Sequence, residues 1–302
     1  MRGRHEIHVV AGVLSDEAGR VLVAQRPIGK HLAGRWEFPG GKLAEGEEPL
    51  AGLKRELAEE LGVTLKSAEP LIRLRHAYSN RDILLDVWRV TAHSGTPQGL
   101  DGQALEWVSP DDLPAVDLLE ADQPIITVLR LPRVARCVAG TEGLFEAVRG
   151  KGPETLFWDP QDADPASEPV REAVRAARRA GYRVIVTGED IQAAMTAAAS
   201  GADGMLLEPS DGMVTIDSGG AFLVGAICPT PAAAEAAMAT GAHFLVLTPG
   251  SDAAEKKRFA GLIERLGLPA YMGWCRDARS LGPARASGAH GCAIRPLVSR
   301  TD

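Results

Sequence analysis

Hydrophobic and polar positions follow different patterns in the two halves of the chain. As far as about residue 130, short apolar runs alternate in the manner of half-buried strands, and turn signals such as residues 16–19 separate them. The pattern predicts strands at residues 7–13, 21–24, 71–78, 83–91 and 105–108. Helices are predicted at residues 49–61 and 124–131. We therefore expect residues 1–131 to form an α+β domain with a mixed sheet.

From residue 132 to residue 302, strands and Ala-rich helices alternate regularly. The predicted strands are residues 134–138, 155–158, 183–187, 204–207, 222–227, 244–248, 270–273 and 291–294. The predicted helices are residues 143–149, 168–180, 190–200, 231–240, 252–266 and 276–287, and the link 207–222 is too polar and Gly-rich for a full helix. This order is typical of a (β/α)₈ barrel of the TIM type, compressed because such barrels usually take about 250 residues.

Composition narrows the class of protein. The 33 Lys and Arg residues against 40 Asp and Glu residues give a net charge of -7, which excludes a broad basic face for polymeric DNA or RNA. No window reaches the roughly 18 apolar residues of a membrane helix, and Glu6 and His8 interrupt the apolar N-terminal stretch, so neither a span nor a secretory signal is expected. The 4 cysteines lack paired spacing. We expect a cytoplasmic protein with reduced thiols.

The predicted helix at residues 49–61 has two distinct faces. The core face is an arc of roughly 80° formed by Leu50, Leu53, Leu57 and Leu61. Glu56, Glu59 and Glu60 share a neighbouring arc of roughly 100°, where like charges repel and no Lys or Arg lies among them. One interpretation is an acidic face exposed to water. The other is a site for Mg²⁺ or Mn²⁺, since clustered carboxylates suit these cations and substrate phosphates complete their coordination.

The spacing around this helix resembles the Nudix signature: Gly41, five residues, Glu47, seven residues, Arg55-Glu56-Leu57, one residue, Glu59-Glu60, one residue, Gly62-Val63. Such a set of fixed positions arises by chance on the order of once in 10⁸ starts. Residues 5–131, including Gln25-Arg26-Pro27 and the run from Trp36 to Lys42, are similar to the MutT-type branch. The resemblance implies a Nudix α/β/α sandwich and a hydrolase that converts nucleoside triphosphates, 8-oxo-dGTP among them, to the monophosphate and pyrophosphate.

The resemblance also implies a set of site residues. Metal ligands are expected from Glu56, Glu59, Glu60 and the backbone carbonyl of Gly40. Arg55 and Asp101 are expected to join the glutamates in catalysis, with Asp101 or a helix glutamate as the general base. The expected substrate-binding residues are Arg26, His31, Phe38, Lys42 and Asp122.

Two positions depart from the MutT-type pattern. Asp101 stands where the branch usually has a loop glutamate, so its carboxylate is one methylene shorter. Asp122 stands where the branch has an asparagine that contacts the oxidised guanine edge. An ionised aspartate only accepts hydrogen bonds, so it would accept from N7–H of 8-oxoguanine and repel O6. The preferred base is therefore open between an oxidised guanine, a pyrimidine triphosphate and another nucleoside diphosphate-linked substrate such as a sugar nucleotide.

The second half, over residues 132–298, is similar to thiamine-phosphate synthase and its TenI-like relatives. The likeness rests on packing and turn positions such as Ser200-Gly-Ala-Asp-Gly204 and Gly241-Ala-His-Phe-Leu-Val-Leu-Thr-Pro-Gly250. The basic and phosphate-binding groups of that family are replaced by Trp158-Asp159, Thr187-Gly188, Pro249-Gly250-Ser251-Asp252 and Gly273-Trp274. We therefore expect a non-catalytic barrel that binds a ligand or acts as a scaffold, including for a homo-oligomer. A transferase making thiamine phosphate is the alternative.

Together these features predict a Mg²⁺-dependent pyrophosphatase of nucleoside triphosphates, with a role in sanitation of the nucleotide pool and in DNA repair.

Overall fold

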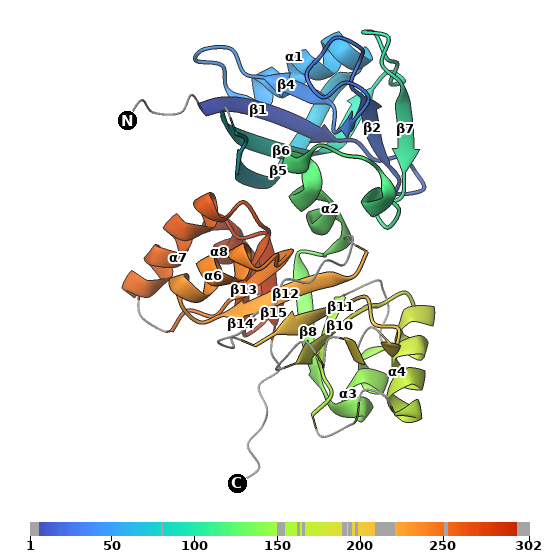
Figure 1. Cartoon of the computed structure of the whole chain (residues 1–302), viewed down its shortest axis with the longest axis vertical. Coiled ribbons are helices and arrows are strands. Elements are labelled where there is room, and N and C mark those ends of the chain that lie inside the picture. The colour runs from blue at the N-terminus through green and yellow to red at the C-terminus, as the bar shows by residue number, and fades with distance from the viewer. Residues whose placement is uncertain are drawn as a thin grey trace. The chain divides into compact units, whose positions relative to one another are not determined.

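The computed structural model describes residues 6–79, 81–149, 155–161, 167–188, 199–208, 221–250 and 253–294, together with residues 164, 192, 195 and 196. Its internal contacts divide the chain into two compact units, Met1–Arg130 and Leu131–Asp302. Figure 1 shows a sheet-and-helix unit in blue and green and a barrel in green to red.

Two small sheets form the N-terminal unit. One sheet has the order β4-β1-β6-β5, with β1 parallel to β6 and antiparallel to β4. The other has the order β3-β2-β7. The strands are β1 (Glu6–Val13), β2 (Val21–Gln25), β3 (Trp36–Glu37), β4 (Gly40–Lys42), β5 (Thr64–Ala77), β6 (Asp82–Ser94) and β7 (Leu105–Val108). The mixed sheet expected from the alternating pattern is confirmed.

The helix α1 (Pro49–Leu61) has the bounds that the sequence predicts. Proline at its first position lacks the N–H that a helix start leaves unbonded, and Gly62 ends it in the left-handed conformation, at φ 67°. Leu53, Leu57 and Leu61 are fully buried, and the helix packs on one face of β1 and β6. The opposite face of that sheet packs against β2, β7 and α2 (Gln123–Arg130).

Two features of this unit differ from the sequence-based expectation. The strand β5 begins at Thr64 rather than at residue 71, because its polar first half pairs with β6 through several irregularities of register. The strands β3 and β4 were not predicted, since runs of two and three residues leave no periodic pattern. Short 3₁₀ helices η1 (Leu113–Ala115) and η2 (Glu120–Asp122) lead into α2.

The C-terminal unit is a closed barrel of eight parallel strands, as predicted. They are β8 (Val134–Ala139), β9 (Thr155–Asp159), β10 (Arg183–Gly188), β11 (Gly204–Leu207), β12 (Leu223–Cys228), β13 (Phe244–Leu247), β14 (Ala270–Cys275) and β15 (Gly291–Ile294). Inward side chains pack as a solid core, in which the rings of Phe157 and Phe244 stack at 5.9 Å and Tyr271 meets both edge-on.

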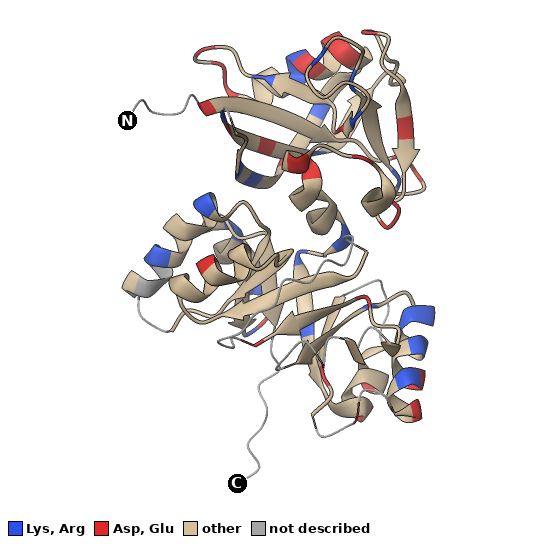
Figure 2. Cartoon of the chain, in the orientation of Figure 1, with Lys and Arg blue, Asp and Glu red and all other residues tan. Residues whose placement is uncertain are grey.

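Described helices on the outside of this barrel are α3 (Gly140–Ala147), α4 (Glu168–Arg179), α6 (Pro231–Ala239), α7 (Ala253–Leu266) and α8 (Leu281–Ala286), with η3 (Ala278–Ser280) before the last. Most of the predicted helix 190–200 and of the link 207–222 lies outside the described residues. The Glu residues of α4 lie in its first half and most of its Arg residues in its second half (Figure 2), and Arg175 pairs with both Glu168 and Glu172. Across the described residues, no helix combines the length and apolar character needed to cross a membrane.

Candidate active site

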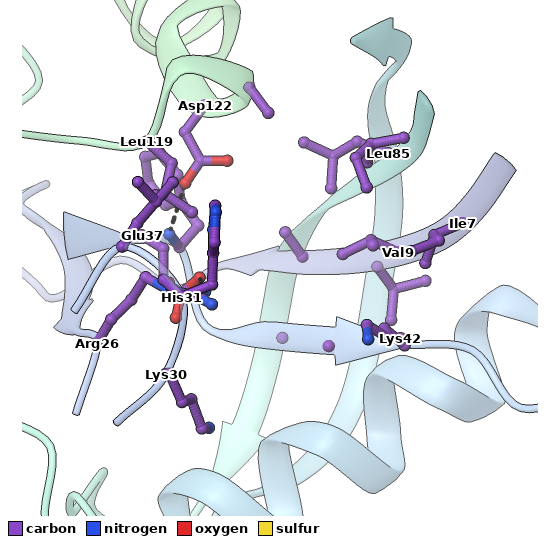
Figure 3. A pocket seen from close by; sticks show the side chains of 18 of the residues that line it. Ile7, Val9, Arg26, Lys30, His31, Glu37, Lys42, Leu85, Leu119 and Asp122 are labelled. Atoms are coloured by element: carbon purple, nitrogen blue, oxygen red, sulfur yellow. Dashed lines mark hydrogen bonds and ion pairs between the residues drawn. The ribbon is translucent and has the colours of Figure 1, made fainter. Parts of the chain in front are cut away.

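A cavity of about 490 Å³ opens in the N-terminal unit. Its walls come from β1, the loop between β2 and β3, the segment around β4, α1, the β5–β6 turn and η2. Two carboxylates of α1, Glu56 and Glu60, line it together with Gly40, and we call this group the carboxylate end. Asp122 on η2 also lines the cavity, and Figure 3 shows it well apart from Lys30, with His31 between them in that view.

The three helix glutamates do not share one environment. Glu56 and Glu60 face the cavity, whereas Glu59 does not line it and its side chain is 61% exposed. Around the helix axis, Glu60 is offset from Glu56 by roughly 40° in one direction, and Glu59 is offset from Glu56 by roughly 60° in the other. Glu56 and Glu60 can therefore face the cavity together while Glu59 faces away from it. Burial raises the pKa of Glu60 to about 7, against the opposing charge of Lys30 and with a further contribution from Glu56.

Arg55 holds the loop before α1 against the helix. Its Nε and Nη2 donate to both carboxylate oxygens of Glu47 at 3.0 and 2.8 Å, and its Nη1 donates to Glu56 at 2.8 Å and to Glu59 at 3.2 Å. These hydrogen bonds lower the pKa of Glu47 to about 2 and raise that of Arg55. No Lys or Arg lies among the three glutamates, but Arg55 on the flank of their face contacts Glu56 and Glu59 and so relieves part of the repulsion.

Two glycines allow the carboxylate end to form. A Cβ atom on Gly41 would lie 2.4 Å from the carboxyl carbon of Glu56, so only glycine lets that carboxylate approach the backbone. Gly40 has φ +151°, and a Cβ there would lie 2.0 Å from the carbonyl oxygen of Val10. The backbone of Gly40 lies near enough to Glu60 to oppose the rise in the pKa of that carboxyl. The β4 segment and the helix are therefore in close contact at this point.

The residues at the carboxylate end fit a divalent cation. Glu56 and Glu60 are hard oxygen donors that repel each other in a partly buried site, and a cation would relieve this repulsion. Within the described part of the chain, no three His, Cys, Asp or Glu side chains are grouped closely enough to hold a metal by themselves. Glu59 would have to leave Arg55 to join the other two glutamates, and backbone oxygen or substrate phosphates would complete the set.

At the other end of the cavity, Asp122 is buried. Asp122 is 5% exposed, and its Oδ2 accepts a hydrogen bond from the backbone N–H of Phe38 at 3.1 Å. Burial raises the pKa of Asp122 to about 7, and the negative charge of Glu37 adds to this shift. Phe38 itself is buried in the core. Tyr78 and Arg81 line the same cavity, with the Arg81 guanidinium 5.9 Å from the centre of the Tyr78 ring.

The remaining predicted residues lie in loops and short strands. Arg26, His31 and Lys42 line the cavity. Arg26 forms an ion pair with Glu37 and donates from Nε to the carbonyl oxygen of His31 at 2.8 Å. Asp101 is not among the lining residues, and its carboxylate lies 3.5 Å from the ammonium group of Lys30.

Sequence reasoning missed several residues that line the cavity, namely Lys30, Glu37, Tyr78 and Arg81 together with apolar side chains such as Ile7 and Leu85. Lys30 and Glu37 lie beside the predicted Arg26, His31 and Phe38, so their closeness in the sequence was an available signal. Tyr78 and Arg81 come from the β5–β6 turn, which only the fold brings to this cavity.

Comparison with known proteins places the N-terminal unit in a family. A profile of the NUDIX domain matches residues 9–128. The 8-oxo-dGTP diphosphatase of Escherichia coli K12 is 34% identical over 125 residues, which are 41% of this chain and 97% of that protein. The CTP pyrophosphohydrolase of the same organism is 38% identical over 130 residues, 43% of this chain and 96% of that protein. The 8-oxo-dGTP diphosphatase of Proteus vulgaris is 41% identical over 91 residues, 30% of this chain and 81% of that protein.

The chain belongs to the Nudix family through a MutT-type domain in its first 130 or so residues. It is accordingly a hydrolase of phosphoric anhydrides, which agrees with the prediction from the signature.

Proposed function

We propose that the N-terminal unit hydrolyses a purine nucleoside triphosphate, 8-oxo-dGTP in the first place, to the monophosphate and pyrophosphate with Mg²⁺ as cofactor. The observation that carries this proposal is one cavity with two unlike ends, a carboxylate end at Glu56 and Glu60 and a buried carboxyl at Asp122. A nucleotide has the same two-part character, a charged polyphosphate and a flat base with hydrogen-bonding edges. Such a hydrolase would remove oxidised nucleotides before DNA synthesis.

Mg²⁺ would be held by Glu56, Glu60 and the carbonyl of Gly40, with Glu59 joining if it leaves Arg55. When bound, the cation supplies charge neutralisation on the phosphates and a more acidic water molecule. Arg55 orients Glu56 through its direct hydrogen bond. A carboxylate on α1 takes the proton from the attacking water, because Asp101 lies outside the lining of the cavity. Lys42 and Arg26 line the same cavity and would stabilise the charge of the phosphates, Arg26 while it is still paired with Glu37.

Recognition of an oxidised guanine depends on the protonation of Asp122. A neutral carboxyl has one O–H donor and one carbonyl acceptor, so it offers the same pair of functions as an asparagine amide. It would accept from N7–H of 8-oxoguanine and donate to O6. The raised pKa of Asp122, about 7, supports a substantial neutral fraction near neutral pH. The buried position thus changes the sequence-based interpretation, in which an ionised aspartate would repel O6.

A cytosine nucleotide is the second candidate substrate. Ionised carboxylates accept hydrogen bonds from the exocyclic amino group of cytosine. Glu37 and Asp122 both line the cavity and interact electrostatically. Glu37 is thus a second carboxylate that could accept from the amino group, and its presence favours a cytosine nucleotide as substrate. The similarity to a CTP pyrophosphohydrolase also supports it.

A substrate panel in Mg²⁺ tests the proposal. Pyrophosphate release would be measured as kcat/KM for 8-oxo-dGTP, dGTP, CTP, dCTP and a nucleotide sugar. We expect 8-oxo-dGTP to exceed dGTP by about tenfold or more, the discrimination that one well-placed hydrogen-bonding group supplies. A higher value for CTP would favour the second candidate, and a higher value for the nucleotide sugar would overturn both. Glu60→Gln, which should fold normally, is the inactive control for a contaminating hydrolase.

For the barrel, we propose a thiamine-phosphate synthase-like ancestry without that activity. At the ends of β9 and β14, Trp158 is buried with its Nε1 bonded to the carbonyl oxygen of Gly140, and Trp274 packs against the barrel core. Neither can replace a basic group that binds phosphate. Expression of the full chain in a thiamine auxotroph should give no growth without thiamine. Growth would show that the barrel is a transferase.

A further inference from the structure

We propose that Lys30 binds substrate phosphate in this site, and that it leaves Asp101 for the phosphate when the nucleotide enters. This inference rests on the hydrolysis of a nucleoside triphosphate proposed above. It adds a binding residue that the signature does not contain. It also assigns a role to the loop at residues 99–103, whose Asp101 holds Lys30 until the nucleotide binds.

The backbone of the β2–β3 loop presents Lys30 at a fixed place. The N–H of Lys30 donates to the carbonyl oxygen of Pro27 at 3.2 Å, which closes a turn with Gly29 at φ +96°. A turn of this kind needs a positive φ at its third position, where glycine has no steric cost. Arg26 closes the base of the loop, because its carbonyl oxygen accepts from the N–H of Gly34 at 3.0 Å. Lys30 is therefore carried by an ordered loop.

Asp101 is held just as firmly on the other side. Its backbone N–H donates to Oε1 of Gln103 at 2.8 Å, and Nε2 of Gln103 donates to the carbonyl oxygen of Glu60 at 3.0 Å. The N–H of Leu100 donates to the same carbonyl oxygen at 3.0 Å. The loop that carries Asp101 is thus fixed to α1 at the residue whose side chain lines the cavity, and Lys30 reaches across to it.

The charged groups of the cavity indicate that Lys30 is available to bind an anionic group of the substrate. Its positive charge opposes the rise that burial causes in the pKa of both Glu37 and Glu60, and its side chain lines the same cavity, so its field reaches the carboxylate end. Arg26 and Arg55 are each engaged by neighbouring glutamates. In the part of the chain that the structure describes, Lys30 instead has one ion pair, with Asp101 at 3.5 Å, and the two side chains are 47% and 49% exposed. An exposed pair of this kind is weak, so an anion carrying several charges can replace Asp101 as the partner of Lys30.

Figure 3 supports an assignment to the polyphosphate rather than to the base. Lys30 lies far from Asp122 in that view, and His31 lies between the two labelled side chains. With the base at Asp122, Lys30 would contact the phosphates beyond the α-phosphate. Lysine suits this role, since its ammonium group acts as a compact point charge on a flexible stem.

Equilibrium binding separates this proposal from a general effect of charge. Binding of a non-hydrolysable triphosphate analogue and of the matching monophosphate would be measured by calorimetry in Mg²⁺. Lys30→Met should weaken binding of the triphosphate by about tenfold or more, the contribution of a charge-assisted hydrogen bond, and change that of the monophosphate less than about twofold. Lys30→Arg should keep most of the affinity. Lys54→Met, an exposed position on α1 outside the cavity, is the matched control and should have no effect.

Asp101→Asn tests the exchange of partners. If Asp101 must release Lys30, the variant should bind the triphosphate about two- to fourfold more tightly, which corresponds to the loss of one weak exposed ion pair. In the Lys30→Met background it should have no effect. Equal tightening in both backgrounds would show a general charge effect and overturn the exchange.

The role of Lys30 and the proposed hydrolysis of a nucleoside triphosphate would be overturned by different results. Normal triphosphate binding by Lys30→Met would overturn the role of Lys30 and leave the proposed hydrolysis intact. Failure of the wild-type chain to bind any triphosphate analogue would overturn the proposed function itself. Thermal unfolding of each variant should remain within about 2 °C of the wild type, as expected for a change at an exposed side chain.

Discussion

At the strand ends of the barrel, Trp158 and Trp274 fill space, and among the described residues Asp159 accepts a local hydrogen bond from the backbone of Gln161. In the N-terminal unit, α1, η2, the β5–β6 turn and the loops beside the short strands β3 and β4 bring carboxylates, two lysines and two arginines to one cavity. Both units have well-packed cores. The difference shows that a solid scaffold is not enough for catalysis, which here depends on charged groups that a helix and several loops hold around one cavity.

The largest expected effect would come from removing a carboxylate that lines the cavity. Glu56→Gln should lower kcat for pyrophosphate release by about 1,000-fold or more, because it removes a proposed metal ligand and a charge beside the reacting phosphates. Asp159→Asn at the end of β9 is the matched change in the barrel and should leave that rate unchanged. A similar loss in both variants would mean that the barrel takes part in the reaction.

The same added methyl group should have opposite consequences in the two units. In Gly41→Ala, the new Cβ meets the carboxylate of Glu56, so kcat should fall by about 100-fold, as expected when a catalytic group is displaced by about 1 Å. In Gly225→Ala, the new Cβ would lie 2.2 Å from the ring of Phe244. Overpacking of this kind costs about 1–3 kcal/mol of unfolding free energy.

Calorimetric unfolding and kcat, measured on both glycine variants, make this comparison. Gly225→Ala should lower the unfolding temperature of the barrel and keep pyrophosphatase activity. Gly41→Ala should lower pyrophosphatase activity and leave the unfolding temperature of the barrel unchanged. Loss of activity in Gly225→Ala at a temperature where it remains folded would contradict the assignment of the chemistry to the N-terminal unit alone.

The pH dependence of the reaction should depend on Asp122. Because burial raises its pKa from 3.8 to about 7, the folded state holds a proton that the unfolded state has lost, so the associated stability is full below about pH 4 and is lost as pH rises towards 7. The neutral form should also bind 8-oxoguanine better. We expect kcat/KM for 8-oxo-dGTP to fall by about tenfold between pH 6 and 8 through this group.

Asp122→Asn separates this contribution from that of other titrating groups. The amide is neutral at every pH, so the variant should lose this fall in kcat/KM and the decline in stability between about pH 4 and 7. Profiles of the variant and the wild type that coincide after scaling would show that Asp122 does not titrate in the site. Among the described residues, the barrel core contains no buried carboxyl group that would give its stability a comparable pH dependence.

The smallest expected effect concerns two arginine networks. Arg55→Lys should lower kcat a few-fold, since lysine cannot make the paired contact with Glu47 while also holding Glu56 and Glu59. Arg175→Lys on α4 changes an exposed network and should alter neither kcat nor the unfolding temperature measurably. If Arg55→Lys had wild-type kcat, the role of Arg55 would be to hold the loop before α1 and not to orient Glu56.

Much of the scaffold followed from local patterns. The leucines of α1 repeat at helical spacing with a proline at the start and a glycine at the end, so its bounds were predictable from residues 49–62 alone. The eight barrel strands are continuous apolar runs, as expected for strands buried on both faces, and their bounds agree with the structure to within about two residues. The polar first half of β5 was missed because its pairing with β6 is irregular.

The sequence by itself determined the Nudix family, the two kinds of fold and which segments carry charge, since these depend on composition, periodicity and fixed spacings along the chain. The tertiary structure decided which groups share the cavity. Only the fold places Lys30 beside Asp101 and brings Asp122 to the N–H of Phe38. The reason is physical: distances between loops and the burial of a carboxyl are set by packing of residues far apart in the sequence, and both control its charge and its partners.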